Sequence, residues 1–296
     1  MSIALVILAA GKGTRMQSDL PKVLHEIAGA PMLVHTMVAG QFLDPERCII
    51  IAGHGADAVR DVVQNHNSDA EIILQTEQLG TGHAVDQARD ALAGFTGNVI
   101  VLYGDSPLIQ AETLETLSAS LSHSAVTVLG FEAKDPGRYG RLITNDDNLK
   151  RIVEFKDASD AEKSMNLCNS GVMAVAAPLL FELLSEIDNE NASGEYYLTD
   201  IVAKAVAQGA VCKVVRCTES ETLGVNSRVD LAQAEYEFQS QRRAEALKNG
   251  VTMPAPETVH FSFDTYIGRD AIVEQNVVFG PGVTVESGVR ICAFSH

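Results

Sequence analysis

Short runs of β-branched and aliphatic residues alternate along the chain with longer segments of helical periodicity, and this alternation constrains the fold most. Strands are predicted at residues 3–9, 48–52, 71–74, 98–103, 125–131, 170–175 and 211–215. Residues 85–92 and 198–207 carry apolar side chains at spacings of three and four, which is typical of helices that cover a sheet. Strands that alternate with helices form a mostly parallel sheet covered on both faces. The sequence therefore predicts an α/β fold.

The pattern changes near residue 226. Residues 227–250 predict one long polar helix, because Ser227 opens the segment with Asp230 three residues on and Gly250 ends it. Two prolines then prevent any continuation of the helix. We expect a first domain at residues 1–226, a linker helix at 227–250 and a third unit at 251–296.

The third unit has a period of six residues. Large apolar side chains recur at Phe261, Ile267, Val273, Phe279, Val285 and Ile291, and small or β-branched residues recur at Ala271, Val277, Val283, Val289 and Ser295. A short period of this kind indicates stacked repeats, each of which buries its apolar face against its neighbours. The pattern resembles that of hexapeptide-repeat proteins. The resemblance implies the first coils of a left-handed parallel β-helix.

Charge and cysteine content exclude several classes of partner. Lys and Arg total 22 against 39 Asp and Glu, a net charge of −17, so the chain repels nucleic acid and anionic membrane surfaces. The apolar run at residues 3–10 is far shorter than the ~18 residues that a membrane span needs. The five cysteines contain no C-x-x-C pair, which predicts reduced thiols and a cytoplasmic protein.

The strongest motif follows the first predicted strand. Residues 8–16 have the sequence L-A-A-G-K-G-T-R-M, and P-K follows at 21–22. Two glycines after a strand indicate that the backbone approaches a ligand closely. The segment lacks the third glycine of a dinucleotide fingerprint and does not match the P-loop. It does bring three cations, Lys12, Arg15 and Lys22, into one short stretch of an acidic chain, which suits a triphosphate.

These residues resemble the signature of the nucleotidyltransferases that join a nucleoside triphosphate to a sugar 1-phosphate. Further motifs resemble one branch of that family, the bifunctional uridylyltransferase/acetyltransferases: Q-T-E-Q-L-G-T-G-H-A at 75–84, Y-G-D at 103–105, G-R-Y-G-R at 137–141, G-E-Y-Y-L-T-D at 194–200 and G-V-N at 224–226. That branch joins a Rossmann-like nucleotidyltransferase domain through a long helix to a trimeric β-helix. The resemblance therefore covers nearly the whole chain and implies a homotrimer.

The resemblance also implies roles for individual residues. It places the nucleotide against Leu8, Ala9, Ala10, Gly11, Lys22, Gln75, Gln78, Gly80, Thr81, Tyr103 and Gly104. It places the sugar against Gly140, Glu154, Asn169, Tyr197 and Thr199. Catalysis would depend on Arg15, Lys22 and Asp105, and Asp105 and Asn226 would bind the cofactor Mg²⁺, which prefers oxygen ligands. A glutamine amide can complement the acceptors and the imide N–H of uracil.

The implied reaction transfers UMP from UTP to N-acetylglucosamine 1-phosphate and yields UDP-N-acetylglucosamine, a precursor of peptidoglycan and lipopolysaccharide, and pyrophosphate. The sugar phosphate is already an anionic nucleophile, so no general base is needed. Cations and Mg²⁺ would overcome the repulsion between the two substrates. The acetyl-transfer site of that branch lies in later β-helix coils, and we expect residues 1–296 to lack that activity.

The residues leave other interpretations open at this stage. Asp105 could cap a helix before Pro107, and Asn226 could cap the helix that follows it. Four histidines, His25, His35, His54 and His83, have no carboxylate or cysteine partner at useful spacing and are predicted to be structural. Alternative functions are a nucleotidyltransferase for another base or sugar phosphate, or an inactive hexapeptide-repeat trimer scaffold.

Overall fold

A nine-stranded sheet forms the centre of the protein. The structure, a computed structural model, describes residues 2–145 and 148–296. The strands lie in the order β5-β4-β1-β6-β10-β7-β11-β9-β8. Their bounds are Ile3–Ala9 (β1), Arg47–Ala52 (β4), Glu71–Leu74 (β5), Asn98–Tyr103 (β6), Val126–Glu132 (β7), Arg141–Asn145 (β8), Asn148–Val153 (β9), Leu167–Ala176 (β10) and Cys212–Cys217 (β11). All the strands predicted within residues 1–226 are present, and their ends differ from the prediction by a few residues.

The sheet is parallel from β5 to β6 and mixed beyond that point. β1 pairs in parallel with β4 and β6, whereas β10 lies antiparallel to both β6 and β7. The pair β7 and β11 is parallel again. The antiparallel hairpin of β8 and β9 was not predicted, because its strands carry many polar and charged residues. The L-A-A-G-K-G-T-R-M motif, which begins in β1, therefore lies in the parallel half of the sheet.

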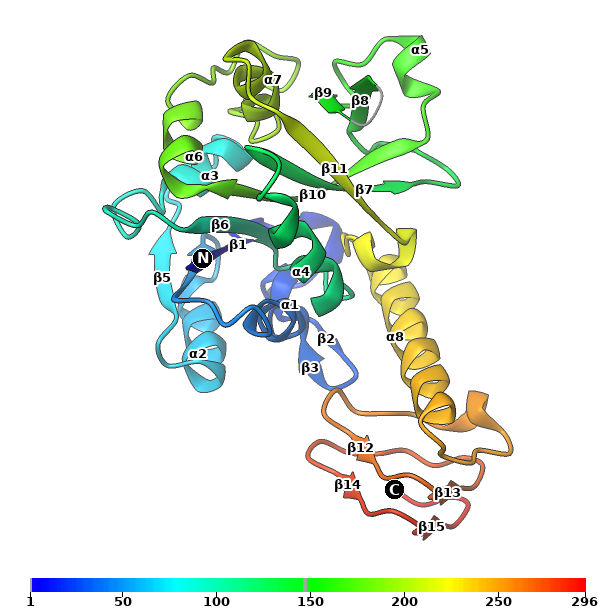
Figure 1. Cartoon of the computed structure of the whole chain (residues 1–296). Coiled ribbons are helices and arrows are strands. Elements are labelled where there is room, and N and C mark those ends of the chain that lie inside the picture. The colour runs from blue at the N-terminus through cyan, green and yellow to red at the C-terminus, as the bar shows by residue number, and fades with distance from the viewer. Residues whose placement is uncertain (1, 146–147) are drawn as a thin grey trace.

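Helices cover both faces of the sheet (Figure 1). Side chains alternate across β1, so that Ala4 and Val6 pack in the core with α3, α6 and α7, and Leu5 and Ile7 pack in the core with α1, α2 and α4. The helices span Met32–Gln41 (α1), Ala56–His66 (α2), Thr81–Asp86 (α3), Ala111–Ser120 (α4), Asp160–Lys163 (α5), Ala177–Leu184 (α6) and Asp200–Ala207 (α7). Short 3-10 turns occupy Thr14–Met16 (η1), Lys22–Leu24 (η2), Glu219–Thr222 (η3) and Pro256–Thr258 (η4).

The helix predicted at residues 85–92 is wrong. Helix α3 begins earlier, at Thr81, and ends at Asp86, after which the chain continues in turns. The N–H groups of Ala88 and Arg89 bond three residues back rather than four, so the backbone tightens. The segment still buries Ala88 and Leu92, which is why its apolar spacing predicted a helix.

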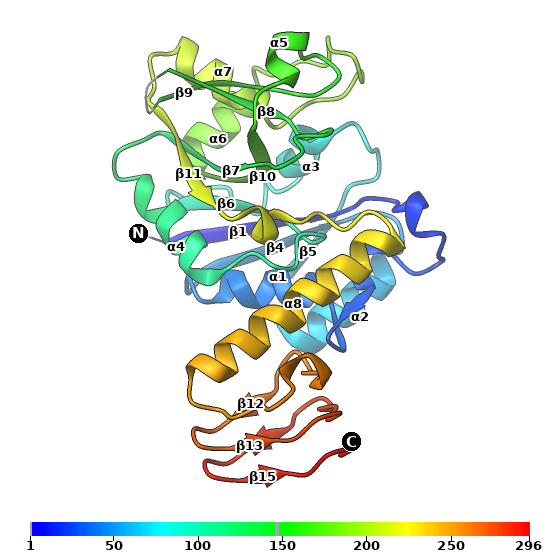
Figure 2. The same ribbon diagram turned by 90° about the vertical axis from the view of Figure 1, so that its right-hand side faces the viewer.

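The long helix α8, Arg228–Lys248, leads from the sheet to the C-terminal segment (Figure 2). Its capping box is the predicted one, since the Ser227 side chain accepts from the Asp230 N–H and Asp230 accepts from the Ser227 N–H. Gln239, only 3% exposed, ties the helix to the following chain. Its Nε2 donates to the Phe261 carbonyl (2.7 Å), and its Oε1 accepts from the Phe261 N–H (2.8 Å).

Short parallel strands stack beyond the end of α8. β12 (Tyr266–Ile267) pairs with β14 (Thr284–Val285), and β13 (Ile272–Val273) pairs with β15 (Arg290–Ile291), in both cases with a register of 18 residues. Eighteen residues are three hexads. The large apolar residues of the six-residue period, among them Phe261, Val273 and Phe279, pack into one core in this stack. No helix of the described residues is long and apolar enough to cross a membrane.

A small hairpin links the stack to the start of the chain. β2 (Glu26–Ile27) and β3 (Ala30–Pro31) are joined by Ala28 and Gly29, both with positive φ. The N–H of Ala28 donates to Glu235 Oε2 of α8 (2.7 Å), and its carbonyl accepts from the Phe263 N–H (2.8 Å). The hairpin tip is therefore held from outside, which offsets the cost of a left-handed alanine.

Replacing Gln239 with alanine should lower the free energy of unfolding by about 3 kcal/mol, because the buried N–H and carbonyl of Phe261 lose their partners. Denaturant titration of wild type and variant measures the difference. Gln233→Ala is the matched control, since Gln233 is an exposed residue of the same helix that bonds only Glu237. Equal stability of the two variants would contradict the role of Gln239.

Candidate active site

The glycine-rich loop after β1 places Lys22 at the end of the parallel strands. Gly13 has a φ of 60°, and a Cβ at that position would lie 2.6 Å from Cβ of Lys22. Only glycine therefore allows the loop and the Lys22 stem to pack together. A Cβ at Gly11 would meet nothing within 4 Å, so the first glycine faces open space.

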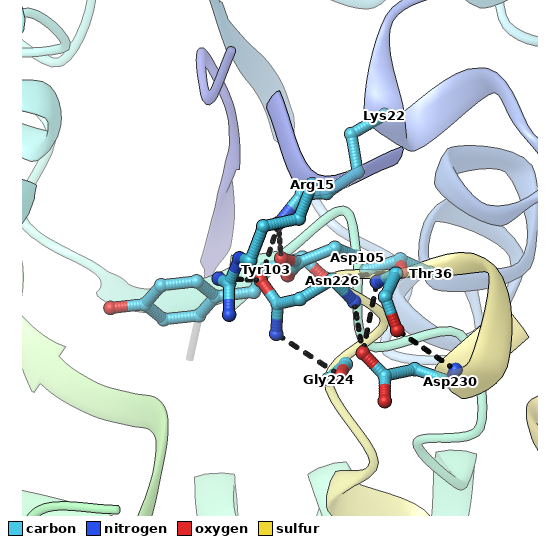
Figure 3. A network of polar contacts seen from close by, with 9 residues as sticks. Arg15, Lys22, Thr36, Tyr103, Asp105, Gly224, Asn226 and Asp230 are labelled. Carbon is cyan, nitrogen blue, oxygen red and sulfur yellow. Dashed lines mark hydrogen bonds and ion pairs between the residues drawn. The ribbon is translucent and has the colours of Figure 1, made fainter. Parts of the chain in front are cut away.

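Four of the predicted residues meet at one point, where Lys22 joins two segments far away in sequence (Figure 3). Lys22 Nζ forms an ion pair with Asp105 Oδ2 and donates to Asn226 Oδ1 (3.1 Å). Arg15 Nη2 donates to the same Asn226 oxygen (2.9 Å). The Lys22 and Asp105 side chains are only 12% and 18% exposed. Two cationic side chains and two side-chain oxygens that accept from them thus converge in a partly buried cluster, called here the Lys22 cluster.

Hydrogen bonds of their backbone groups hold Asp105 and Asn226 in place. Asp105 follows β6, and its carbonyl accepts from the Val225 N–H (2.9 Å), which brings residue 226 beside it. The Asn226 N–H donates to Asp230 Oδ2 (2.9 Å). The capping alternatives for Asp105 and Asn226 are wrong, because no helix begins after Asp105 before α4 and because Ser227 caps α8. Both side chains instead face the cation cluster.

A cavity of about 320 Å³ opens beside this cluster. Its lining contains all but one of the residues to which the family resemblance gave a nucleotide role: Leu8, Ala9, Ala10, Gly11, Lys22, Gln75, Gln78, Gly80, Thr81 and Tyr103. Asp105 also lines it. Gly104 does not, since its N–H donates to the Leu8 carbonyl (3.0 Å) and holds the two strand ends together.

The far end of this cavity is shaped by tight backbone packing. Gly80 has a φ of 116°, and a Cβ there would lie 2.5 Å from the Tyr196 carbonyl oxygen. Gln78 Nε2 donates to the Ala10 carbonyl (2.7 Å), which closes the wall between the loop and residues 75–81. Gly80 and the Ala10 carbonyl therefore bring backbone close to this part of the cavity.

Two of the five predicted sugar residues line a second cavity of about 410 Å³, and the other three lie near Glu154. Glu154 and Tyr197 line it, and Glu154 Oε1 accepts from Thr199 Oγ1 (3.1 Å). The Gly140 carbonyl accepts from the Asn169 N–H (2.8 Å), and a Cβ at Gly140 would lie 3.5 Å from Glu154 Oε1. The structure thus brings all five residues together.

Glu195 lines both cavities, and the sequence prediction missed it. It lies in the G-E-Y-Y-L-T-D segment that carried part of the resemblance, so a signal was present. Arg138 and Lys156 were also missed; they line the second cavity. Lys12 lies elsewhere, in a neighbouring cavity of about 650 Å³ with His54, and is not part of the Lys22 cluster.

Two titratable groups between the cavities have shifted pKa values. Burial raises the pKa of Glu154, and the carboxylates of Asp200, Asp157 and Glu195 raise it further, against the hydrogen bond from Thr199. Burial also raises the pKa of Tyr103, helped by Glu154 and Asp105. The Tyr103 hydroxyl therefore keeps its proton at neutral pH and can donate a hydrogen bond.

Residues 5–208, which include most of β1, the lining of both cavities and the Lys22–Asp105 pair, match the model of the MobA-like NTP transferase domain. The chain belongs to the MobA-like NTP transferase family. This NTP transferase is 62% identical over 296 residues to the bifunctional protein GlmU of Ruegeria sp. (strain TM1040). It is 58% identical to that of Roseobacter denitrificans (strain ATCC 33942 / OCh 114). The alignments cover 100% of the chain and 66% of each relative.

Solved structures confirm the predicted Rossmann-like nucleotidyltransferase fold. The NTP transferase superposes on an inositol-1-phosphate CTP transferase from T. maritima with a TM-score of 0.64 at 19% identity, covering 81% of this chain and 96% of that one. It superposes on a UDP-glucose pyrophosphorylase complexed with UDP-glucose with a TM-score of 0.66 at 18% identity, covering 82% and 100%. At these identities the likeness concerns the fold alone.

Replacing Glu154 with glutamine should stabilise this NTP transferase more at neutral than at acid pH. The folded protein holds the Glu154 proton more tightly than the unfolded chain, so wild-type stability falls as pH rises from the ordinary value of 4.5 through the raised one. Glutamine cannot ionise and escapes this loss. Denaturant titrations at about pH 4 and about pH 7 measure the difference. The exposed Glu257→Gln serves as control. A stabilisation by Glu154→Gln that becomes smaller toward pH 7 would contradict the raised pKa of Glu154.

Proposed function

We propose that the chain transfers UMP from UTP to N-acetylglucosamine 1-phosphate, releasing pyrophosphate. The observation that carries this proposal is the convergence of Lys22, Arg15, Asp105 and Asn226 beside the cavity that Gln75 and its neighbours line. Relatives 62% and 58% identical are named bifunctional protein GlmU, and their likeness extends over the whole chain. The triphosphate would lie with its base in this cavity and its phosphates against the cation cluster.

Electrostatic repulsion between the two anionic substrates is the main barrier to this reaction. A phosphate oxygen of the sugar phosphate would attack the α-phosphorus of UTP, a new P–O bond would form, and the bond to the bridging oxygen would break as pyrophosphate leaves. The ammonium of Lys22 and the guanidinium of Arg15 would neutralise phosphate oxygens and align the two groups. The nucleophile is already ionised, so none of these residues has to remove a proton.

Asp105 and Asn226 are the residues that would hold Mg²⁺. They fit the ion, because their side-chain oxygens already converge on a single cation, the Lys22 ammonium, and because Mg²⁺ takes one or two protein oxygens together with phosphate oxygens. When bound, the ion supplies charge neutralisation and orientation of the phosphates. Lys22 would then exchange its contact with Asp105 for one with a phosphate.

The second cavity would receive the sugar. Glu154 and Asn169 can bond hydroxyl or acetamido groups, Tyr197 supplies a ring face, and Thr199 orients Glu154 through its hydrogen bond. Gly140 leaves space beside Glu154 that a side chain would fill. Glu195, which lines both cavities, lies where the sugar and the nucleotide would meet.

We also propose how the chain is organised and where it acts. Residues 1–226 would be the catalytic domain, 227–250 a linker helix, and 251–296 the first coils of a left-handed β-helix, for which the 18-residue register and the hexad core are the support. The coils would assemble three copies into a homotrimer. The product would feed the synthesis of peptidoglycan and lipopolysaccharide in the cytoplasm.

Lys22→Ala should lower the rate of pyrophosphate release ~100-fold, since losing one group that stabilises transition-state charge costs about 3 kcal/mol. The assay uses UTP, N-acetylglucosamine 1-phosphate and Mg²⁺, with folding of the variant checked by its melting temperature. Lys248→Ala, at the distant end of α8, should retain wild-type turnover. Near-normal turnover of Lys22→Ala would remove Lys22 from the site.

Removing the divalent ion should abolish turnover, and Asp105→Asn should demand a higher Mg²⁺ concentration for half-maximal rate, by about tenfold or more. The reason is that the variant loses the only carboxylate of the cluster while keeping its shape. A magnesium titration of initial rate measures the change. Full activity in the presence of a chelator would contradict the assignment of Asp105 and Asn226 as metal ligands.

A further inference from the structure

The side-chain amide of Gln75 is held in one orientation. Gln75 follows β5 in the wall of the nucleotide cavity and is only 6% exposed. Its Nε2 donates to the Gly80 carbonyl (3.2 Å) and lies 3.0 Å from His83 Nδ1. A carbonyl oxygen can only accept, so the amide atom that faces Gly80 must be the nitrogen.

Both N–H bonds of this amide are therefore engaged within the protein. One points to the Gly80 carbonyl and the other to His83 Nδ1. No described residue donates a hydrogen bond to the remaining atom, Gln75 Oε1, while the residue itself lines the cavity. The amide can offer a ligand an acceptor and nothing else.

His83 supports this arrangement from behind the cavity wall. It lies in α3 and does not line the cavity. Accepting at Nδ1 leaves the proton of a neutral imidazole on Nε2, which lies 3.2 Å from the Gln87 side-chain amide. Gln87 Nε2 also donates to the His83 carbonyl (3.1 Å), so its second N–H and the Nε2 proton of His83 cannot both lie between the two nitrogens. The half-buried Gln87 side chain can turn away from Nε2, whereas Gln75 is only 6% exposed and held by the Gly80 carbonyl. The predicted structural role of His83 thus extends to the orientation of a cavity residue.

We propose that His83 is a positioning residue that fixes the Gln75 amide with its oxygen toward the nucleotide, so that the cavity selects a pyrimidine whose ring nitrogen carries a proton. This inference rests on the proposed function and deepens it. Uracil presents an N–H at ring position 3 and would donate to Gln75 Oε1. Cytosine presents a lone pair at the same position, and two acceptors facing each other without a proton leave a buried oxygen unsatisfied.

The proposal predicts a specific loss of selectivity. Without His83, only the Gly80 carbonyl holds the amide nitrogen, and the amide can rotate to offer an N–H to cytosine. His83→Ala should lower the ratio of kcat/KM for UTP over CTP by about tenfold, the usual effect of one hydrogen bond. His83→Asn should keep the ratio within about threefold of wild type, because its side-chain oxygen can accept in the place of Nδ1. The kcat for UTP should change little in both variants, since the His83 side chain contacts Gln75 and Gln87 and no residue of the Lys22 cluster.

The test measures initial rates of pyrophosphate release with UTP and with CTP for wild type, His83→Ala and His83→Asn. Calorimetric binding of UMP and CMP to the same three proteins gives a second readout that needs no turnover. A wild-type preference for UTP that falls in His83→Ala and returns in His83→Asn supports the proposal. An unchanged ratio in a folded His83→Ala, equal losses in both variants, or a wild-type preference for CTP overturns it.

The two readouts also separate this inference from the proposed function. If wild type binds UMP but converts no UTP with the sugar phosphate, the proposed function fails, and the UMP-to-CMP binding ratios still decide the role of His83. If wild type is active and the UTP-to-CTP and UMP-to-CMP ratios are the same in wild type and both variants, the positioning role of His83 is wrong and the proposed function stands.

Discussion

The contact of Lys22 with Asp105 and Asn226 is the interaction on which the site depends. It joins three segments that are far apart in sequence, namely the glycine-rich loop, the end of β6 and the start of α8. In a chain with a net charge of −17, a half-buried lysine is a rare local source of positive potential. The parallel strands deliver these residues to one edge of the sheet, which is where open α/β sheets bind ligands. The ends of the parallel strands and the local positive charge of Lys22 therefore indicate the same ligand site.

The two cavities differ in the chemical groups that line them. The first is lined by residues 8–11 of the loop, by Gly80 and by polar side chains such as Gln75, which suits a flat base and a phosphate chain. The second is lined by side chains that can exchange hydrogen bonds with hydroxyl groups. Glu195 belongs to both. Lys22 and Asp105 line the first cavity, so the charged groups of a molecule bound there would meet the Lys22 cluster.

Much of the fold could be predicted because its strands are short, apolar and bounded by polar segments. Most strands between β1 and β11 carry that signal. The β8–β9 hairpin, which lies among them in the sequence, is polar on one side and does not. The segment at 85–92 misled the prediction because apolar spacing is the same for a helix and for a series of buried turns. The site followed from motifs and from the family resemblance, which gave roles to Lys22 and none to Lys12. Residue types alone grouped all three cations, because the close packing of Gly13, with its positive φ, against the Lys22 stem is not visible in a list of residue types. His83 was set aside because its partner is an amide rather than a carboxylate.

The β2–β3 hairpin has a mechanical consequence for Lys22. Its strands are two residues each, too short to fix their own position, so its tip is located by Glu235 and by residues 262 and 263. Its other end runs directly into η2, which begins at Lys22. The position of the Lys22 ammonium therefore depends on the contacts that the hairpin makes with α8 and with residues 262 and 263. A displacement of the hexad stack would therefore reach Lys22 through residues 26–31 as well as through α8.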